Sequence, residues 1–335
     1  MNTKTRPRVI VVTGASAGVG RATVRALARE GASIGLIARG RDGLEGARKD
    51  VEELGGKALV LPTDVADADA VEAAAARVEQ ELGPIDVWVN VAMTSVFSPV
   101  REMQPAEFKR VTEVNYLGYV YGTLAALKRM LPRDRGRIIQ VGSALAYRGI
   151  PLQSAYCASK HAIQGFMDSL RCELLHDDSG VTVCMIQMPA MNTPQFGWVK
   201  SRLPKQAQPV PPIYQPEVAA EAIVFASHNR RREIYVGLPT VEAIVGNKFF
   251  PGLLDHYLAR TGIKAQQTDQ EKPANQADNL FEPVPGDHGA HGAFDDRSES
   301  NSPQLWTSMH RGWIGLLLVT LGAAAFASFF GKSRL

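Results

Sequence analysis

Short, continuous apolar runs alternate with helical patterns through the first two thirds of the chain, and this alternation is the strongest constraint on the fold. Continuous apolar strands are typical of a parallel sheet that is buried on both faces, and each crossover between such strands carries a helix. Because these crossovers are right-handed, helices cover both faces. The sequence therefore predicts an α/β fold with a doubly wound parallel sheet. The predicted strands are 8–13, 33–38, 57–61, 85–90, 137–141, 181–187 and 233–236, and the predicted helices are 19–30, 42–54, 68–82, 217–227 and two longer stretches within 106–131 and 154–176.

A glycine-rich loop, TGASAGVG at residues 13–20, joins the first predicted strand to the first predicted helix. Gly14 suits a tight turn, Gly18 lets the backbone approach a diphosphate, and Gly20 lets the helix pack closely on the sheet. The free N–H groups at the helix N-terminus favour phosphate. An ordinary glycine-rich loop is the alternative. Residues 13–20, however, directly follow the first strand of an alternating chain, and this position indicates a Rossmann-type dinucleotide site.

The end of the second predicted strand bears on the choice of cofactor. An enzyme that selects NAD usually carries an acid there, which holds the ribose 2′-OH. Residues 38–41 read ARGR and include no acid, and the Arg39 guanidinium can pair with a 2′-phosphate. The alternative is that Arg39 and Arg41 are only solvated side chains at the start of a helix. We predict NADP(H) as the cofactor.

Tyr156 and Lys160 are four residues apart, so a helix would present both on one face. A free tyrosine is mostly protonated at neutral pH, because its pKa is about 10. A nearby ammonium group and an oxidised nicotinamide would lower that pKa, and the phenol could then exchange a proton with an alcohol or a carbonyl. Ser143 follows a predicted strand, and its hydroxyl could bind the substrate oxygen. Taken alone, a tyrosine and a lysine four residues apart are common by chance.

Together with other motifs, the chain resembles the short-chain dehydrogenase/reductase family, in its compact single-domain branch, over roughly residues 8–240. TGASAGVG is similar to the family's TGxxxGxG loop, and Asp64-Val65 to its adenine-contacting pair after the third strand. Asn115 resembles the family's catalytic asparagine. Ser143, Tyr156 and Lys160 match its Ser…Tyr-x-x-x-Lys in order and spacing.

The resemblance implies particular roles for particular residues. Asn115 would kink its helix and hold a water that links Lys160 to solvent. Lys160 would also bind the nicotinamide ribose, and Thr193 the nicotinamide carboxamide. The implied catalytic set is Asn115, Ser143, Tyr156 and Lys160, and the implied cofactor contacts are Gly14, Ser16, Gly18, Val19, Gly20, Arg39, Asp64, Val65, Asn90, Tyr156, Lys160, Pro189 and Thr193.

Two positions depart from the family pattern. The family's Asn-Asn-Ala-Gly after the fourth strand is NVAM at 90–93, so Met93 replaces a glycine beside the cofactor. The family's Pro-Gly after the sixth strand is Pro189-Ala190. Neither change removes a reacting group, but both bear on how well the cofactor fits.

The segment 191–216 would supply a lid over the active site. It is apolar, with Phe196, Trp198, Val199 and Leu203. This composition suits an apolar or lipid-like alcohol/carbonyl substrate better than a sugar. The alternative is that these side chains only pack the lid onto the domain.

The composition changes after the catalytic domain, which we assign to residues 1–263. Residues 239–263 are expected to be helical on the rim of the sheet. Residues 264–305 are rich in polar residues, glycine and proline without apolar periodicity, which predicts a disordered linker. Residues 306–335 include an uncharged apolar run from Trp313 to Phe330. As a helix this run would span roughly 27 Å, so we expect a C-terminal transmembrane anchor.

The bulk composition excludes some classes of function. A net charge of +3 is small for 335 residues and offers no reason to expect nucleic acid as a partner. Three cysteines match neither a disulfide framework nor a zinc site, which favours reduced thiols and no bound metal. No N-terminal signal is visible, so we expect a cytoplasmic catalytic domain on a membrane, with assembly into a homo-oligomer left open. A non-catalytic NADP(H)-binding sensor or scaffold, and a structural membrane adaptor, are the rival functions.

Overall fold

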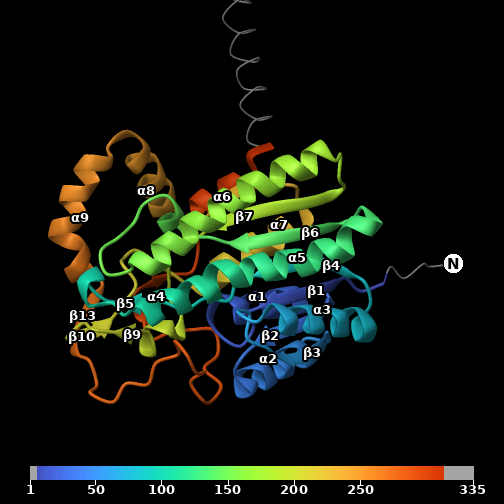
Figure 1. Cartoon of the computed structure of the whole chain (residues 1–335), viewed down its shortest axis with the longest axis horizontal. Coiled ribbons are helices and arrows are strands. Elements are labelled where there is room, and N and C mark those ends of the chain that lie inside the picture. Colours follow the sequence, from blue (N-terminus) through green and yellow to red (C-terminus); the bar gives the residue numbers. More distant parts are fainter. Residues whose placement is uncertain (1–5, 313–335) are drawn as a thin grey trace, which may run out of the picture.

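Seven parallel strands form the central sheet of the computed structural model, which describes residues 6–312. Their order is β12-β7-β6-β4-β1-β2-β3, so the chain order reverses between β1 and β4 (Figure 1). Ligands of doubly wound folds bind outside the carboxyl ends of the strands at such a reversal. The predicted α/β fold is therefore confirmed. The strands of this sheet are β1 Val9–Thr13, β2 Ser33–Ala38, β3 Lys57–Pro62, β4 Ile85–Asn90, β6 Gly136–Val141, β7 Val181–Gln187 and β12 Glu233–Tyr235.

Helices cover both faces of the sheet and create two hydrophobic cores. Within β1, Ile10 and Val12 join the core beneath α1, α2 and α7, while Val9 and Val11 join the core beneath α3, α5 and α6. Side chains of a strand alternate between its two faces, so a strand that feeds two cores is apolar throughout. The helices are α1 Gly18–Ala28, α2 Arg41–Glu53, α3 Ala68–Leu82, α4 Pro105–Thr112, α5 Gly118–Met130, α6 Ser154–His176 and α7 Pro216–His228.

The long helical stretch predicted within 106–131 is interrupted. It consists of α4, a π-helical turn at Glu113–Leu117, and α5. Asn115 lies inside the π-helical turn and has no exposed surface. The interruption occurs where the family resemblance implies a kink, and π-helical turns of this kind are frequent at functional sites.

The apolar stretch expected to be helical on the rim forms a hairpin of two helices, α8 Leu238–Phe249 and α9 Pro251–Ala265. Pro251 begins α9, where its missing N–H costs nothing. The hairpin follows β12 and contacts it through α8, and its turn reaches the upper edge of the molecule (Figure 1).

The prediction of a disordered linker at 264–305 is wrong. The segment folds back over the domain, where β13 Gln267–Glu271 pairs with β10 and β14 Ser298–Glu299 pairs with β11. Leu280, Ala290 and Phe294 are buried by this packing. The packed unit therefore continues past residue 263 and includes α10 Pro303–Met309, which contacts β12. The short strands outside the central sheet are β5 Val96–Phe97, β8 Ala190–Met191, β9 Lys200–Ser201, β10 Lys205–Ala207, β11 Ile213–Tyr214, β13 and β14.

The predicted membrane anchor falls almost entirely outside the described residues, which end at 312. No helix within residues 6–312 combines the length and the apolar character needed to cross a membrane.

Candidate active site

The glycine loop follows β1 and lies at the carboxyl edge of the sheet. Gly14 and Gly18 have φ of 69° and 56°, in the left-handed region that favours glycine. A side chain at Gly20 would collide with the carbonyl of Gly14, so only glycine allows α1 to start this close to the loop. The Thr13 hydroxyl accepts hydrogen bonds from the amides of Val91 (3.0 Å) and Ala92 (3.2 Å), which ties the end of β1 to the end of β4.

Two cavities adjoin this loop and together make one cleft. The larger, of about 420 Å³, is lined by Tyr156 and Lys160, and we call it the catalytic cavity. The smaller, of about 130 Å³, lies at the ends of β2 and β3, and we call it the distal cavity. The two share lining residues, among them Gly14, Ser16, Met93 and Trp198.

The structure brings most of the sequence-predicted site residues to this cleft. Those that line the catalytic cavity are Gly14, Ser16, Gly18, Val19, Gly20, Ser143, Tyr156, Lys160, Pro189 and Thr193. Those that line the distal cavity are Gly14, Ser16, Arg39, Asp64 and Val65.

Tyr156 and Lys160 lie on the first turns of α6, as their spacing predicts. The Lys160 ammonium is 5.5 Å from the centre of the Tyr156 ring. It donates hydrogen bonds to the carbonyl oxygen of Val141 (2.7 Å) and to the hydroxyl of Tyr119 (3.2 Å). Lys160 is 1% exposed, so these two oxygens provide most of its solvation.

Burial shifts both groups away from their ordinary pKa values. It lowers the pKa of Lys160 to about 7, because a desolvated ammonium is costly. It raises the pKa of Tyr156, an effect that the neighbouring Ser143 hydroxyl opposes only in part. In the absence of further charge, Tyr156 is therefore a proton donor and not a phenolate.

Ser143 is held against the cavity by its neighbours. Its backbone amide donates to the side chain of Gln187 (2.8 Å), and its hydroxyl accepts from the amide of Leu145 (3.1 Å). Gln187 was not predicted from the sequence, because a polar residue inside an apolar strand carries no motif. Its amide group also donates to Glu233 (2.6 Å), which fixes its orientation.

Two of the predicted residues lie behind the cavity walls. The Asn115 side chain accepts from the amide of Thr94 (2.8 Å) and donates to its carbonyl (2.9 Å), and it also donates to Ser159 (3.3 Å) on α6. Asn90 has no exposed surface; its side chain accepts from Trp88 (2.8 Å) and donates to Gln140 (3.0 Å). In these positions both asparagines brace the elements that carry the site.

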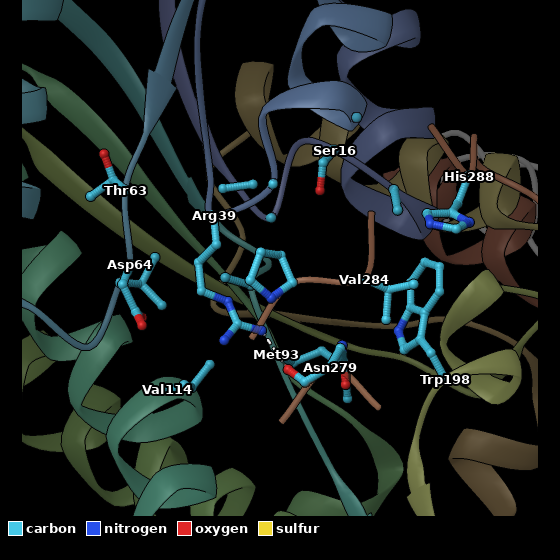
Figure 2. A pocket seen from close by; sticks show the side chains of 18 of the residues that line it. Ser16, Arg39, Thr63, Asp64, Met93, Val114, Trp198, Asn279, Val284 and His288 are labelled. Atoms are coloured by element: carbon cyan, nitrogen blue, oxygen red, sulfur yellow. Dashed lines mark hydrogen bonds between the residues drawn. The ribbon is translucent and has the colours of Figure 1, made fainter. Parts of the chain in front are cut away.

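The C-terminal segment supplies part of the cleft that the sequence did not predict. Asn279 lines both cavities, and Val284 and His288 line the distal one (Figure 2). The missed signal is the pair of glycines at 286 and 289, both with positive φ, which mark a tight turn where the polar composition favoured disorder.

Trp198 stands between the two cavities, and its ring meets that of His288 edge-on at 4.5 Å. Its indole Nε1 is buried and has no hydrogen-bond partner within residues 6–312. An unpaired buried donor is costly, so this position favours a ligand that brings an acceptor.

Comparisons with known proteins identify the family of the chain. The model of the short chain dehydrogenase family matches residues 8–202. An uncharacterized oxidoreductase of Bacillus subtilis, YxnA, is 32% identical over 287 residues, which cover 85% of this chain and 81% of the relative. A fatty acyl-CoA reductase of Acinetobacter baylyi is 30% identical and covers 71% of this chain and 78% of its own length. A 3-dehydrosphinganine reductase of Danio rerio is 35% identical, with 64% and 67% covered.

Solved structures give the same result. An alcohol dehydrogenase from Thermococcus sibiricus in complex with 5-hydroxy-NADP matches 69% of this chain and 96% of its own, with 29% identity and a TM-score of 0.60. An actinorhodin polyketide ketoreductase with NADPH matches 69% and 95%, with 28% identity and a TM-score of 0.62. With its glycine loop, its Ser143, Tyr156 and Lys160 in one cavity and these matches, the chain belongs to the short-chain dehydrogenase family of oxidoreductases.

Proposed function

We propose that the chain is an NADP(H)-dependent oxidoreductase that interconverts an alcohol and a carbonyl on an apolar substrate, with a cytoplasmic catalytic domain held at a membrane. One observation carries the proposal: the glycine loop, Ser143, Tyr156 and Lys160 all face a single cavity of about 420 Å³. A dinucleotide and a small substrate can therefore meet beside a phenol and an ammonium group that can move a proton.

The chain's own residues control the proton. When bound, the cofactor supplies or accepts the hydride. Tyr156 donates its hydroxyl proton to the carbonyl oxygen during reduction and takes a proton from the alcohol during oxidation. Protonated Lys160 stabilises the resulting phenolate by its charge, against the cost of burial. We assign to the Ser143 hydroxyl the hydrogen bond to the substrate oxygen.

The preference for NADP(H) is supported by the distal cavity. Arg39 lines it, and no acidic residue lies at the end of β2 to hold a ribose 2′-OH. The unpaired Trp198 Nε1 offers a donor to a polar ligand in the same cleft. The similar solved structures carry 5-hydroxy-NADP and NADPH, in agreement with this choice.

An apolar substrate is supported by the apolar side chains around the catalytic cavity. Leu145, Ile150, Phe196, Val210 and Leu258 line it. Two of the relatives are named for fatty acyl-CoA and for 3-dehydrosphinganine, and both compounds carry alkyl chains.

The membrane location is supported by the α8–α9 hairpin, which also lines the catalytic cavity through Ala243 and Leu258. Its turn exposes Phe249 (65%), Phe250 (63%) and Leu253 (68%). This turn and the end of α10 both lie at the upper edge of Figure 1, and the uncharged run that starts at Trp313 follows α10 directly. Exposed aromatic side chains on the side where the described chain ends suit a lipid surface.

The enzymatic proposal is tested by the loss of NADPH absorbance with aldehydes and ketones of increasing alkyl length. We expect turnover with NADPH, weaker use of NADH, and kcat/KM that rises with chain length. A charge-assisted contact from Arg39 to a 2′-phosphate is worth on the order of 1.5–3 kcal/mol, or roughly tenfold or more in affinity. Tight NADPH binding without turnover on any carbonyl would favour the rival sensor or scaffold.

A further inference from the structure

Residues 279–289, which we call the clasp, cross the cofactor cleft from the lid to the start of α1. The clasp lies beyond residues 8–202, which match the family, so no role in the family's chemistry covers it. It is attached at both ends. Leu280 has no exposed surface and packs with Val96, Val111 and Ala155, while Gly289 accepts a hydrogen bond from the amide of Gly18 (3.0 Å).

One ion pair and several hydrogen bonds of main-chain groups hold the clasp between these ends. Asp287 pairs with the guanidinium of Arg21 at 2.9 Å, and Arg21 is itself almost fully buried on α1. The amide of Gly286 donates to the carboxylate of Asp42 (2.9 Å) at the start of α2. The clasp is therefore tied to the first turns of both helices that flank the glycine loop.

The clasp forms the outer wall of the distal cavity. In Figure 2, Thr63, Asp64 and Arg39 lie on one side of this space and Val284 and His288 on the other. The cavity sits at the carboxyl ends of β2 and β3, away from Tyr156, where a doubly wound fold holds the adenosine half of a dinucleotide. With the clasp in place, this half of the cleft is a cavity of about 130 Å³ that Pro283, Val284 and His288 bound on one side.

Arg39 connects the clasp to the expected position of the 2′-phosphate. Its guanidinium donates to three consecutive carbonyls of the clasp, those of Asn279, Leu280 and Phe281 (2.6 Å for the last). A guanidinium has five N–H donors in a planar fork, so two remain for a phosphate. The same side chain can thus bind the cofactor and hold the cover over it.

We propose that the clasp closes over the adenosine half of NADP(H), so that the cofactor enters and leaves only when residues 279–289 lift away from Arg39 and α1. The inference rests on the proposed use of NADP(H). It adds a part of the binding site that lies outside residues 8–202, which match the family, and it makes opening of the clasp the step that limits cofactor exchange.

A disulfide lock tests this directly. A Cβ atom at Gly40 would lie 3.5 Å from the Cβ of Pro283 on the clasp, within the range of disulfide geometry. Gly40 has φ of −76°, which other residues adopt freely. We would make Gly40→Cys/Pro283→Cys in a Cys172→Ser background, since Cys172 is exposed while the other two cysteines are buried. NADPH dissociation is then followed by its fluorescence when excess NADP⁺ is added, before and after reduction.

The oxidised variant, closed while empty, should bind no NADPH. Closed after loading, it should release NADPH at least about tenfold more slowly than the same protein after reduction. Equal rates of NADPH exchange in the oxidised and reduced forms, with the disulfide verified by mass, would overturn the proposal that the clasp controls cofactor exchange. If the reduced variant and the parent both bind no nicotinamide nucleotide, the proposed function fails first and the clasp with it.

A second pair of variants opens the clasp and does not depend on the disulfide. Leu280→Ala removes the buried anchor, whereas Phe281→Ala changes the adjacent side chain, which is 48% exposed, and keeps the backbone carbonyls. We expect Leu280→Ala to release NADPH about tenfold faster and to exchange the amide hydrogens of 279–289 faster, with Phe281→Ala close to the parent. In the parent, NADPH should slow exchange of these amides; unchanged exchange in the presence of bound NADPH contradicts the proposal.

Discussion

At the scale of single residues, the site contains two ionisable groups, Tyr156 and Lys160, whose burial opposes the roles proposed for them. Burial favours a neutral Lys160 and a protonated Tyr156, while proton transfer needs a positive charge that can stabilise a phenolate. The hydrogen bonds from Lys160 to the Val141 carbonyl and the Tyr119 hydroxyl offset part of this cost. Lys160 is thus poised between charge states near neutral pH, whereas Tyr156 stays protonated until further positive charge comes near its hydroxyl.

Tyr156→Phe tests the assignment of the proton donor. The variant keeps the ring and loses only the hydroxyl, so turnover should fall by roughly 10²–10⁴-fold while NADPH affinity stays near the parent value. Steady-state kinetics and fluorescence titration measure the two quantities. Tyr257→Phe, at a tyrosine that is 59% exposed on α9, is the matched control and should leave both unchanged. Near-normal kcat in Tyr156→Phe would remove the tyrosine from the mechanism.

Lys160→Met tests the buried ammonium through the pH dependence of stability. The folded pKa of Lys160 is about 7 and the model-compound value is 10.5, so between these values the unfolded chain holds more protons than the folded one. The free energy of unfolding of the parent, relative to that of the variant, should therefore rise with pH across this window. Below about pH 7 the difference between the two proteins should not change with pH. Thermal unfolding of both proteins from pH 6 to pH 10, in steps of about one unit, measures this difference. A difference that does not change with pH means that Lys160 titrates normally.

At the scale of secondary-structure elements, the sequence predicts those strands and helices whose pattern follows from side-chain periodicity and burial. Strands such as β1 are apolar throughout because Val9 and Val11 face one core while Ile10 and Val12 face the other, so their pattern is unambiguous. Tyr156 and Lys160 were predictable for a similar reason, since helical spacing alone puts them on one face. The clasp was not predictable in this way. Its order comes from main-chain groups, such as the carbonyl of Gly289, which every sequence carries.

The close approach of α1 to the glycine loop predicts opposite effects for one substitution at two glycines. At Gly20 a methyl group would meet the Gly14 carbonyl, so Gly20→Ala should destabilise the fold by about 1–3 kcal/mol and weaken NADPH binding. Gly165 lies exposed within α6 with open space at its Cβ position, so Gly165→Ala should stabilise by about 0.5–1 kcal/mol. Urea unfolding of the two variants measures both values. Equal changes in the free energy of unfolding would show that crowding of backbone atoms at Gly20 does not determine the effect of an added methyl group.

At the scale of the whole molecule, the cleft lies between two segments that follow the last strand of the central sheet in the sequence. The clasp covers its distal end, and the α8–α9 hairpin borders its catalytic end through Leu258. Cofactor and substrate would then use different exits: NADP(H) from beneath the clasp, and an apolar substrate past the hairpin. Because the exposed Phe249 and Phe250 stand at the tip of that hairpin, a substrate dissolved in lipid would reach the cavity without crossing bulk water.

The proposed membrane location predicts two separable attachments. The full chain should resist carbonate extraction, because an uncharged apolar run of this length is costly to leave in water. A chain that ends at residue 312 keeps every described element and should be released by carbonate, yet still sediment weakly with lipid vesicles through the hairpin. In that shorter chain Phe250→Asp should abolish sedimentation, since a charge opposes insertion, while Val100→Asp, at a residue 67% exposed elsewhere on the surface, should not. Release of the full chain by carbonate would contradict the anchor. Equal sedimentation of the two Asp variants would contradict contact between the hairpin and lipid, and would leave the substrate to reach Tyr156 from water.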